Sequence, residues 1–277
     1  MNQGSKVTAL VPAYESAGFI QETLDSLSAQ TYDNFDVLVS VDVCDDDTYE
    51  ICCRHAAADS RFKVIRVTGN RLGYVGNCNL LMRQAEADYV MLAFHDDLLE
   101  PTFTSKLCAT LDSRPEAVLA FPDVHYTSVD GSEEIWQYKL LEEVKERVKR
   151  GRRIVYRLDR WWVPNRGMFR LERSRRIGGI KHHRANEFSV DLPWLFHMSL
   201  LGEFIRVPEV LCHKVRKPGS LSRSWDFTAR QYFEVISSCM RELWNSELTT
   251  EEKMLLNADI MHILRELHSK IPQPEQS

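Results

Sequence analysis

Short apolar runs alternate with helix-like patterns along the first 120 residues of the chain. Between the runs, apolar residues recur at the three- and four-residue spacing of an amphipathic helix, as Ile20, Leu24 and Leu27 do. This alternation predicts βαβ units and a mainly parallel sheet. The predicted strands cover residues 7–11, 35–41, 62–67 and 89–94, and the predicted helices cover 18–30, 47–58 and 76–87.

Beyond these residues the pattern loosens, and two helical regions stand out. Residues 138–153 are rich in Glu, Lys and Arg around a narrow apolar stripe. Their mixed signs favour a solvated surface helix over a helix that lies on a membrane. Residues 226–244 and 250–270 predict two amphipathic helices, suited to packing on this chain or on a partner. Thr249 and Glu252 form a capping box that begins the second of them.

The composition is that of an ordinary globular protein. The chain has 277 residues, of which 44% are apolar, so it can bury a full core. Its net charge of -5 argues against a protein that coats nucleic acid. No apolar run approaches the roughly 20 residues that cross a bilayer, and the N-terminus lacks the pattern of a signal peptide. We therefore expect a cytosolic protein with no transmembrane segment and no nucleic-acid partner.

The 7 cysteines are scattered in a way that suits neither a disulfide framework nor zinc spacing. We expect most of them to be reduced, buried, small apolar residues. Cys44 lies in an acidic turn, where neighbouring carboxylates raise a thiol pKa and make it a poor nucleophile.

Two carboxylates and an imidazole, His95-Asp96-Asp97, follow the predicted strand at 89–94. Acid groups at the carboxyl end of such a strand sit where open α/β sheets bind their ligands. There they are well placed to hold a divalent metal against phosphate oxygens. Asp-Asp is also ordinary turn chemistry, so this motif alone leaves both interpretations open.

Two further strand ends bring polar groups to the same edge of the predicted sheet. The first strand ends in Pro12-Ala13-Tyr14-Glu15, and the second ends at Asp42. The Asp42 carboxylate suits a base N–H or a ribose hydroxyl, whereas Asp45 or Asp46 suits capping of the next helix. The glycines and amides of residues 70–77 suit a tight loop against a phosphate or ribose, with Arg71 in the loop as a diphosphate partner.

Four segments match the motifs of one family in order and spacing across roughly residues 6–225. They are residues 7–15, Ser40-Val41-Asp42, Asn70-x-x-Gly73-x-x-Gly76-Asn77-x-Asn79 and His95-Asp96-Asp97-x-x-x-Pro101. Each motif is loose, but the ordered set is specific, and it resembles the family 2 glycosyltransferases of the GT-A fold. The resemblance implies an α/β fold with a mainly parallel central sheet flanked by helices. It also implies a nucleotide-diphospho-sugar donor, most often a UDP-sugar, with Mn²⁺ or Mg²⁺ and inverting transfer to a glycan or lipid-linked acceptor.

The resemblance also suggests how the chain is divided and where its sites lie. The expected units are a GT-A domain at 1–225, its nucleotide-sugar-binding half at 1–120, its acceptor-binding half at 121–225, and a C-terminal helical extension at 226–277. The residues expected at the donor are Pro12, Tyr14, Glu15, Asp42, Asn70, Arg71, Gly76, Asn77, Asp96 and Arg216. The expected metal ligand is Asp97, in what corresponds to the family's Asp-x-Asp element, with His95 and His213 as further candidates. In the acceptor half, Trp161 and Trp162 suit either sugar stacking or core packing.

A candidate base lies in residues 187–201, where a helix is predicted to begin around Asp191. The family's catalytic acid, often the Asp of a Glu-Asp pair, falls on Asp191, with Val190 in place of the Glu. A carboxylate near the diphosphate can take the acceptor proton, although Asp also caps helices routinely. The resemblance favours the base, and Glu187 is the reserve candidate.

The sequence and the resemblance therefore predict a metal-dependent inverting glycosyltransferase of glycan or polysaccharide biosynthesis. Any contact with the membrane is expected to be peripheral and to come through its acceptor. The alternatives are a noncatalytic nucleotide-sugar-binding module and a sugar nucleotidyltransferase. The second needs a basic, Gly-rich loop after the first strand, which Pro12-Ala13-Tyr14-Glu15-Ser16 is not. A dinucleotide-binding oxidoreductase is excluded because no G-x-G-x-x-G follows that strand.

Overall fold

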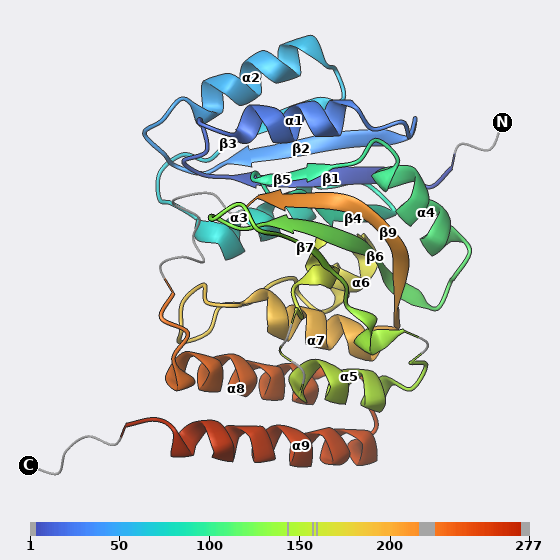
Figure 1. The fold of residues 1–277 in the computed structure, drawn as a ribbon, viewed down its shortest axis with the longest axis vertical. Helices are drawn as coiled ribbons and strands as arrows, with labels where there is room; N and C mark the ends of the chain where they lie inside the picture. The colour runs from blue at the N-terminus through green and yellow to red at the C-terminus, as the bar shows by residue number, and fades with distance from the viewer. Residues whose placement is uncertain (1–3, 143, 157, 159, 216–224, 273–277) are drawn as a thin grey trace, which may run out of the picture.

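A nine-stranded sheet runs through the computed structural model, which describes residues 4–142, 144–156, 158, 160–215 and 225–272 (Figure 1). Its strands are β1 (Val7–Ala13), β2 (Phe35–Val41), β3 (Phe62–Arg66), β4 (Tyr89–Leu92), β5 (Asp97–Leu99), β6 (Ala117–Thr127), β7 (Glu133–Trp136), β8 (Met168–Arg170) and β9 (Glu203–Val215). The helices are α1 (Ile20–Ser28), α2 (Thr48–Ala58), α3 (Gly73–Gln84), α4 (Phe103–Asp112), α5 (Arg147–Tyr156), α6 (Leu171–Arg176), α7 (Asp191–Leu201), α8 (Ala229–Asn245) and α9 (Thr250–Ser269), with short 3-10 turns η1 (Lys139–Leu141) and η2 (Val163–Arg166).

The first half of the sheet is parallel, in the order β3-β2-β1-β4. Every residue of β1 is buried, because α1 and α2 lie on one side of these strands and α3 lies on the other (Figure 1). Burial on both faces explains why the strands read as continuous apolar runs. The predicted alternation of strands and helices is confirmed here.

The second half of the sheet is mixed. β8 runs antiparallel to both β4 and β6, β9 runs parallel to β6, and β5 runs antiparallel to β9. The predicted strand at 89–94 ends at Leu92, and the chain leaves the sheet before β5 begins at Asp97. The β5–β9 register pairs Asp97 with Lys214, which brings Lys214 from the second half of the chain to the His95-Asp96-Asp97 motif.

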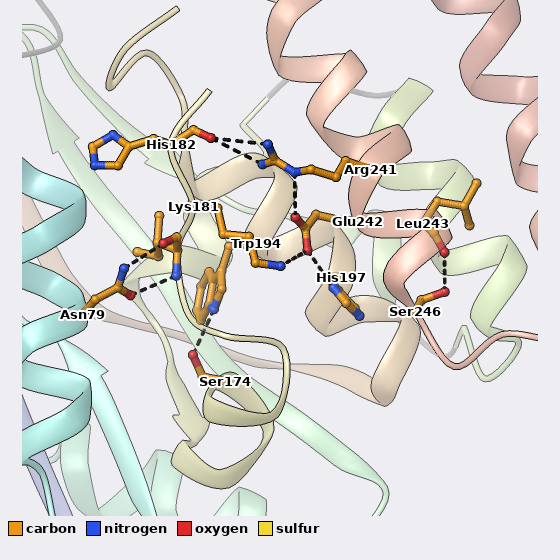
Figure 2. A network of polar contacts seen from close by, with 11 residues as sticks. Asn79, Ser174, Lys181, His182, Trp194, His197, Arg241, Glu242, Leu243 and Ser246 are labelled. Atoms are coloured by element: carbon orange, nitrogen blue, oxygen red, sulfur yellow. Dashed lines mark hydrogen bonds and ion pairs between the residues drawn. The ribbon is translucent and has the colours of Figure 1, made fainter. Parts of the chain in front are cut away.

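Helices α7, α5, α8 and α9 are stacked below the sheet, with α7 nearest to it and α9 farthest from it (Figure 1). α7 is buried along almost its whole length, since it packs between the sheet and these helices. Both C-terminal helices begin with a capping box, as predicted for Thr249 with Glu252 and also at Thr228 with Gln231. The buried Glu242 side chain of α8 accepts hydrogen bonds from His197 of α7 and from Lys181, which ties α8 to the body of the protein (Figure 2).

Residues 138–153 do not form the solvated surface helix that their charge pattern predicts. The segment contains the short turn η1, and α5 starts only at Arg147. The prediction was wrong about one continuous helix. The arginines of α5 stay near solvent, since Arg147 and Arg152 are 42% and 46% exposed, but they also pair with Glu252 at 2.6 Å and Asp259 at 2.7 Å, both on α9. No helix among the described residues is long and apolar enough to span a membrane.

Within residues 187–201 the helix begins at Asp191, as predicted. Asn186 and Ser189 have φ of 56° and 49°, a left-handed conformation that a helix cannot continue through. Pro193 therefore falls in the first turn of α7, where its missing N–H costs little.

Candidate active site

The carboxyl ends of β1, β2 and β4 meet at one edge of the sheet, as the sequence predicts. The Asp42 N–H donates to the Ala13 carbonyl at 2.9 Å, which joins the ends of β1 and β2. His95 follows β4, and its Nδ1 lies 3.1 Å from the carbonyl oxygen of Pro12 in β1. Ligands of open α/β sheets bind at such an edge.

The Asp42 carboxylate holds the loop that precedes α3. Its Oδ1 accepts hydrogen bonds from the N–H groups of Val43 at 2.9 Å and Leu72 at 3.0 Å. Its Oδ2 accepts from the N–H of Gly73 at 2.8 Å. Gly73 has a φ of +68°, which a residue with a side chain adopts only with strain. Asp42 is thus buried and fixes the backbone of this loop.

Tyr14 and Arg71 stack on each other beside that loop. The Arg71 guanidinium lies 3.6 Å from the centroid of the Tyr14 ring, and the Tyr14 hydroxyl donates to Glu15 at 2.6 Å. A hollow of about 480 Å³ adjoins the end of β2 and is lined by residues 41–47, 49, 50 and 66–69. This volume falls within the range of small-molecule sites. Tyr14, Glu15, Asp42 and Arg71 are therefore brought together as predicted.

The other predicted donor residues occupy different positions around this edge. Asn77 is buried in α3, and its amide donates to backbone carbonyls at the ends of β1 and β2. Gly76 lies one residue earlier in the same helix, and Asn70 is exposed in the loop. Pro12 is buried in β1, where its carbonyl faces His95. Arg216 lies outside the described residues.

Asp96 and Asp97 are both paired with cations. Asp97 accepts from Nε of Arg166 at 3.0 Å through Oδ2 and from Nζ of Lys214 at 3.1 Å through Oδ1. The same Nζ lies 3.2 Å from Oδ2 of Asp96. Burial opposes ionisation of Asp96, but the surrounding positive charges, that of Lys214 foremost, together outweigh it and hold the pKa of this carboxyl below its ordinary value.

The two predicted histidine ligands, His95 and His213, make polar contacts with groups other than the Asp97 carboxylate. His95 is enclosed, and burial lowers the pKa of its imidazole, so the ring is neutral at pH 7. His213 contacts Glu100, with 2.7 Å between Nε2 and Oε1, and its ring packs against His125. Within the described part of the chain, no three His, Cys, Asp or Glu side chains are grouped to hold a metal.

Asp96 and Asp97 nevertheless fit a divalent ion of the kind that binds phosphates. The Lys214 ammonium is a stand-in for a cation between them, so the pair is already arranged around positive charge. Mg²⁺ in nucleotide sites is commonly held by one or two carboxylates, while substrate phosphates and water complete its shell. A two-carboxylate site is consistent with that coordination.

Asp191 is the first residue of α7, yet its side chain does not cap the helix. The N-cap residue is Val190, and no side chain accepts a capping hydrogen bond there. Instead, Oδ2 of Asp191 accepts from Nδ2 of Asn165 at 2.5 Å. Burial raises the pKa of Asp191 to about 6, although the charge of Arg166 and the Asn165 hydrogen bond act in the opposite direction. The reserve candidate, Glu187, accepts a hydrogen bond from the backbone N–H of Tyr74.

Three residues of the site were missed by the sequence analysis: Asn165, Arg166 and Lys214. The turn η2 presents Asn165 to Asp191 and, one residue later, Arg166 to Asp97. Arg166 also lies over the ring of Trp162, 4.7 Å from its centroid, so the Trp162 side chain supports the site as well as the core. The one available signal for Asn165 and Arg166 was that they lie three and four residues after Trp162.

Comparison with known proteins gives the chain relatives among bacterial glycosyltransferases. Residues 8–177, more than half of the chain, match the family described as Glycosyl transferase family 2. The chain is 29% identical over 113 residues to the putative glycosyltransferase EpsH of Bacillus subtilis, a match that covers 41% of this chain and 32% of EpsH. It is 31% identical over 114 residues to the putative glycosyltransferase EpsE of the same organism, which covers 40% of each protein. The match therefore spans well under half of either relative.

Solved structures share the fold at low sequence identity. Staphylococcus aureus TarS 1-349 in complex with UDP-GlcNAc superposes with a TM-score of 0.70 at 19% identity, covering 96% of this chain and 72% of that one. The mannosyltransferase PcManGT from Pyrobaculum calidifontis, in complex with GDP-Man and Mn²⁺, has a TM-score of 0.61 at 17% identity and covers 97% and 74%. These neighbours confirm the predicted GT-A fold. The chain is a member of glycosyl transferase family 2.

Proposed function

We propose that this glycosyltransferase moves a sugar from a UDP-sugar to an acceptor hydroxyl with inversion, in glycan or polysaccharide biosynthesis. The observation that carries the proposal is the turn η2. In this turn Asn165 donates to the buried carboxylate of Asp191, and the next residue, Arg166, donates to Asp97. We call Asp96 and Asp97 the acid pair. This link supports placing the proposed base and the proposed metal-binding carboxylates in one site.

The donor half of the proposal rests on the edge formed by β1 and β2. The hollow of about 480 Å³ beside Asp42 is large enough for a nucleoside. The stacked pair of Tyr14 and Arg71 adds an aromatic face and a positive charge next to it. TarS, a structural neighbour, has been solved with UDP-GlcNAc and with UDP, which supports a UDP-sugar as the donor.

Asp96 and Asp97 are the residues that would hold Mn²⁺ or Mg²⁺. A bound divalent ion would offset the charge that develops on the departing nucleoside diphosphate. Arg166 already lies against Asp97 and adds a fixed positive charge at this end of the site. The Mn²⁺ complex of the structural neighbour PcManGT supports the use of a divalent metal in this chain.

Asp191 is the proposed base. The acceptor oxygen attacks the anomeric carbon from the face opposite the diphosphate, and its proton passes to a carboxylate oxygen of Asp191. The new C–O bond forms as the bond to the diphosphate oxygen breaks, and one displacement inverts the anomeric carbon. A pKa of about 6 leaves Asp191 mostly ionised at neutral pH and still able to accept a proton. We place this reaction in the cytosol, and a lipid-linked acceptor would bring the protein to the membrane surface.

The experiment that tests this function begins with ligand binding. UDP-, GDP-, CDP- and TDP-sugars are screened by thermal shift with and without Mn²⁺, because a ligand that binds the folded state raises its apparent stability. We expect UDP-sugars to give the largest shift. No shift with any nucleotide would refute the donor site.

Transfer is then measured as nucleoside diphosphate released with a panel of acceptor glycosides and lipid-linked sugars. Asp191→Asn is expected to keep the donor-induced thermal shift and to lose transfer by about 100-fold or more, the usual contribution of a general base. Asp33→Asn, which changes an exposed acid just before β2 and outside the lining of the hollow, is the matched control and should keep both. Full transfer by Asp191→Asn would refute the base, and donor binding without transfer by the wild type would favour a noncatalytic binding module.

A further inference from the structure

Lys214 occupies the space between the two carboxylates of the acid pair. Its Nζ lies 3.1 Å from Oδ1 of Asp97 and 3.2 Å from Oδ2 of Asp96. The three side chains are largely enclosed, with exposed fractions of 17%, 3% and 12% for Lys214, Asp97 and Asp96. Charge-assisted hydrogen bonds of this kind are among the stronger polar interactions in proteins.

The fold itself sets this contact. β5 and β9 run antiparallel, and their register places Asp97 directly opposite Lys214. Side chains directly opposite each other in an antiparallel pair lie on the same face of the sheet and interact. The neighbouring His213 points to the other face, where it binds Glu100. The alternation of β9 therefore selects Lys214, and not the histidine, for the acid pair.

The charges at this point are already balanced. Two carboxylates face two cations, since Arg166 binds the remaining Oδ2 of Asp97. A divalent ion at Oδ1 of Asp97 and Oδ2 of Asp96 would contact the oxygens that bind the Lys214 ammonium. Two cations a few ångströms apart repel strongly in an enclosed site. The ammonium and a divalent ion cannot both occupy these two oxygens.

We propose that Lys214 is a tethered cation that competes with the divalent metal for Asp96 and Asp97. In the donor-free protein the ammonium holds the acid pair and keeps its affinity for metal low. When the donor binds, its diphosphate offers the ammonium a new negative partner and offers the metal additional oxygen ligands. Metal and donor consequently bind with positive coupling, each increasing the affinity for the other. The inference rests on the proposed donor site, but it concerns metal affinity in the absence of any sugar nucleotide.

The test is a titration of Mn²⁺ into the full chain without nucleotide, with free Mn²⁺ followed by its electron paramagnetic resonance signal. Lys214→Met and Lys214→Gln are expected to bind Mn²⁺ at least about tenfold more tightly than the wild type, since the loss of one charged hydrogen-bonding partner changes affinity by about this much. Lys214→Arg keeps the charge and should remain as weak as the wild type. Lys181→Met is the matched control, because Lys181 also pairs with a buried acid, but that acid is Glu242 of α8 and not a member of the acid pair.

The double variant Asp97→Asn/Lys214→Met should bind Mn²⁺ no more tightly than the wild type, which would assign the higher affinity of Lys214→Met to this site. Adding UDP should reduce the difference in Mn²⁺ affinity between the wild type and Lys214→Met. Equal or weaker Mn²⁺ binding by both Lys214→Met and Lys214→Gln, in folded protein, would overturn the tethered cation.

The titration separates this inference from the proposed function. If the two lysine variants gain no affinity while UDP-sugar transfer proceeds, only the tethered cation is refuted. If they gain affinity while no sugar nucleotide binds or reacts, the inference stands for the cation site and the proposed transfer is refuted.

Discussion

Arg166 donates from Nε to Oδ2 of Asp97 at 3.0 Å, and the exposed fractions of the two side chains are only 11% and 3%. The guanidinium also lies over the rings of Phe94 and Trp162, at 4.3 Å and 4.7 Å from their centroids. A cation enclosed in this way has exchanged water for one carboxylate and two aromatic faces. Arg166 therefore couples the stability of the fold to the charge of the acid pair.

Removal of Arg166 should be costly because it leaves a buried carboxylate with one partner fewer. We expect Arg166→Met to lower the free energy of unfolding by about 3 kcal/mol, the usual loss when one member of a buried pair is removed. Arg176→Met is the control, since Arg176 and its partner Glu247 are 44% and 57% exposed. An exposed pair contributes at most about 1 kcal/mol. Urea unfolding measures both, and equal losses would contradict the buried pair's importance.

The pH dependence of transfer should report the ionisation of Asp191. A base works only in its deprotonated form, so the rate should rise with pH through about 6, the raised pKa of this carboxyl, and fall below it. The positive charge of Arg166 lowers that pKa, so Arg166→Met should move the acidic limb to higher pH. Profiles of kcat against pH for the two proteins measure the shift. An unmoved limb would assign it to a different group.

Asp42 should matter through the backbone that it holds. Asp42→Ala leaves the N–H groups of Val43, Leu72 and Gly73 without their acceptor, which should lower the free energy of unfolding by about 2 kcal/mol. The released loop carries Arg71, so the thermal shift produced by UDP should shrink as well. Asp33→Ala, at an exposed acid just before β2 and outside the lining of the hollow, is the control and should leave both quantities near the wild-type values. A full UDP shift in Asp42→Ala would separate the loop from nucleotide binding.

The N-terminal half of the fold was predictable because its signals are local. Strands covered on both faces are continuous apolar runs, and the helices between them show a clear period. The grouping of Tyr14 with Asp42 and Arg71 followed from the rule that parallel strands end at one edge.

The cations of the site could not be predicted, because their placement depends on long-range register. Whether His213 or Lys214 faces Asp97 is decided by a one-residue choice in the pairing of β5 with β9, two strands separated by more than 100 residues. Arg166 reaches Asp97 from a 3-10 turn that has no periodic signal. For the same reason, the ion pairs of the α5 arginines could not be predicted, because their acidic partners Glu252 and Asp259 lie far along the chain on α9.

The network around Glu242 offers a test of how α8 is held to the rest of the chain (Figure 2). Glu242 is buried and accepts from His197 Nδ1 at 2.9 Å and from Lys181 Nζ at 2.7 Å. Glu242→Gln keeps the shape of the side chain but removes its charge, so we expect it to lower the free energy of unfolding at pH 7 by about 2 kcal/mol. Glu247→Gln, at an acid that is 57% exposed, should change it by less than about 1 kcal/mol.

The pH dependence of that difference has a definite sign. Burial alone would raise the pKa of Glu242, but the hydrogen bonds from His197 and Lys181 outweigh it and lower the pKa below its usual 4.5. A carboxylate with a lowered pKa in the folded state stabilises the protein fully above its ordinary pKa and loses that contribution as the pH falls through the folded value. The gap between wild type and Glu242→Gln should therefore be constant near neutrality and close as the pH drops below 4.5. Urea unfolding at a series of pH values measures it, and a gap that widens on acidification would mean that the charge of Glu242 destabilises the fold.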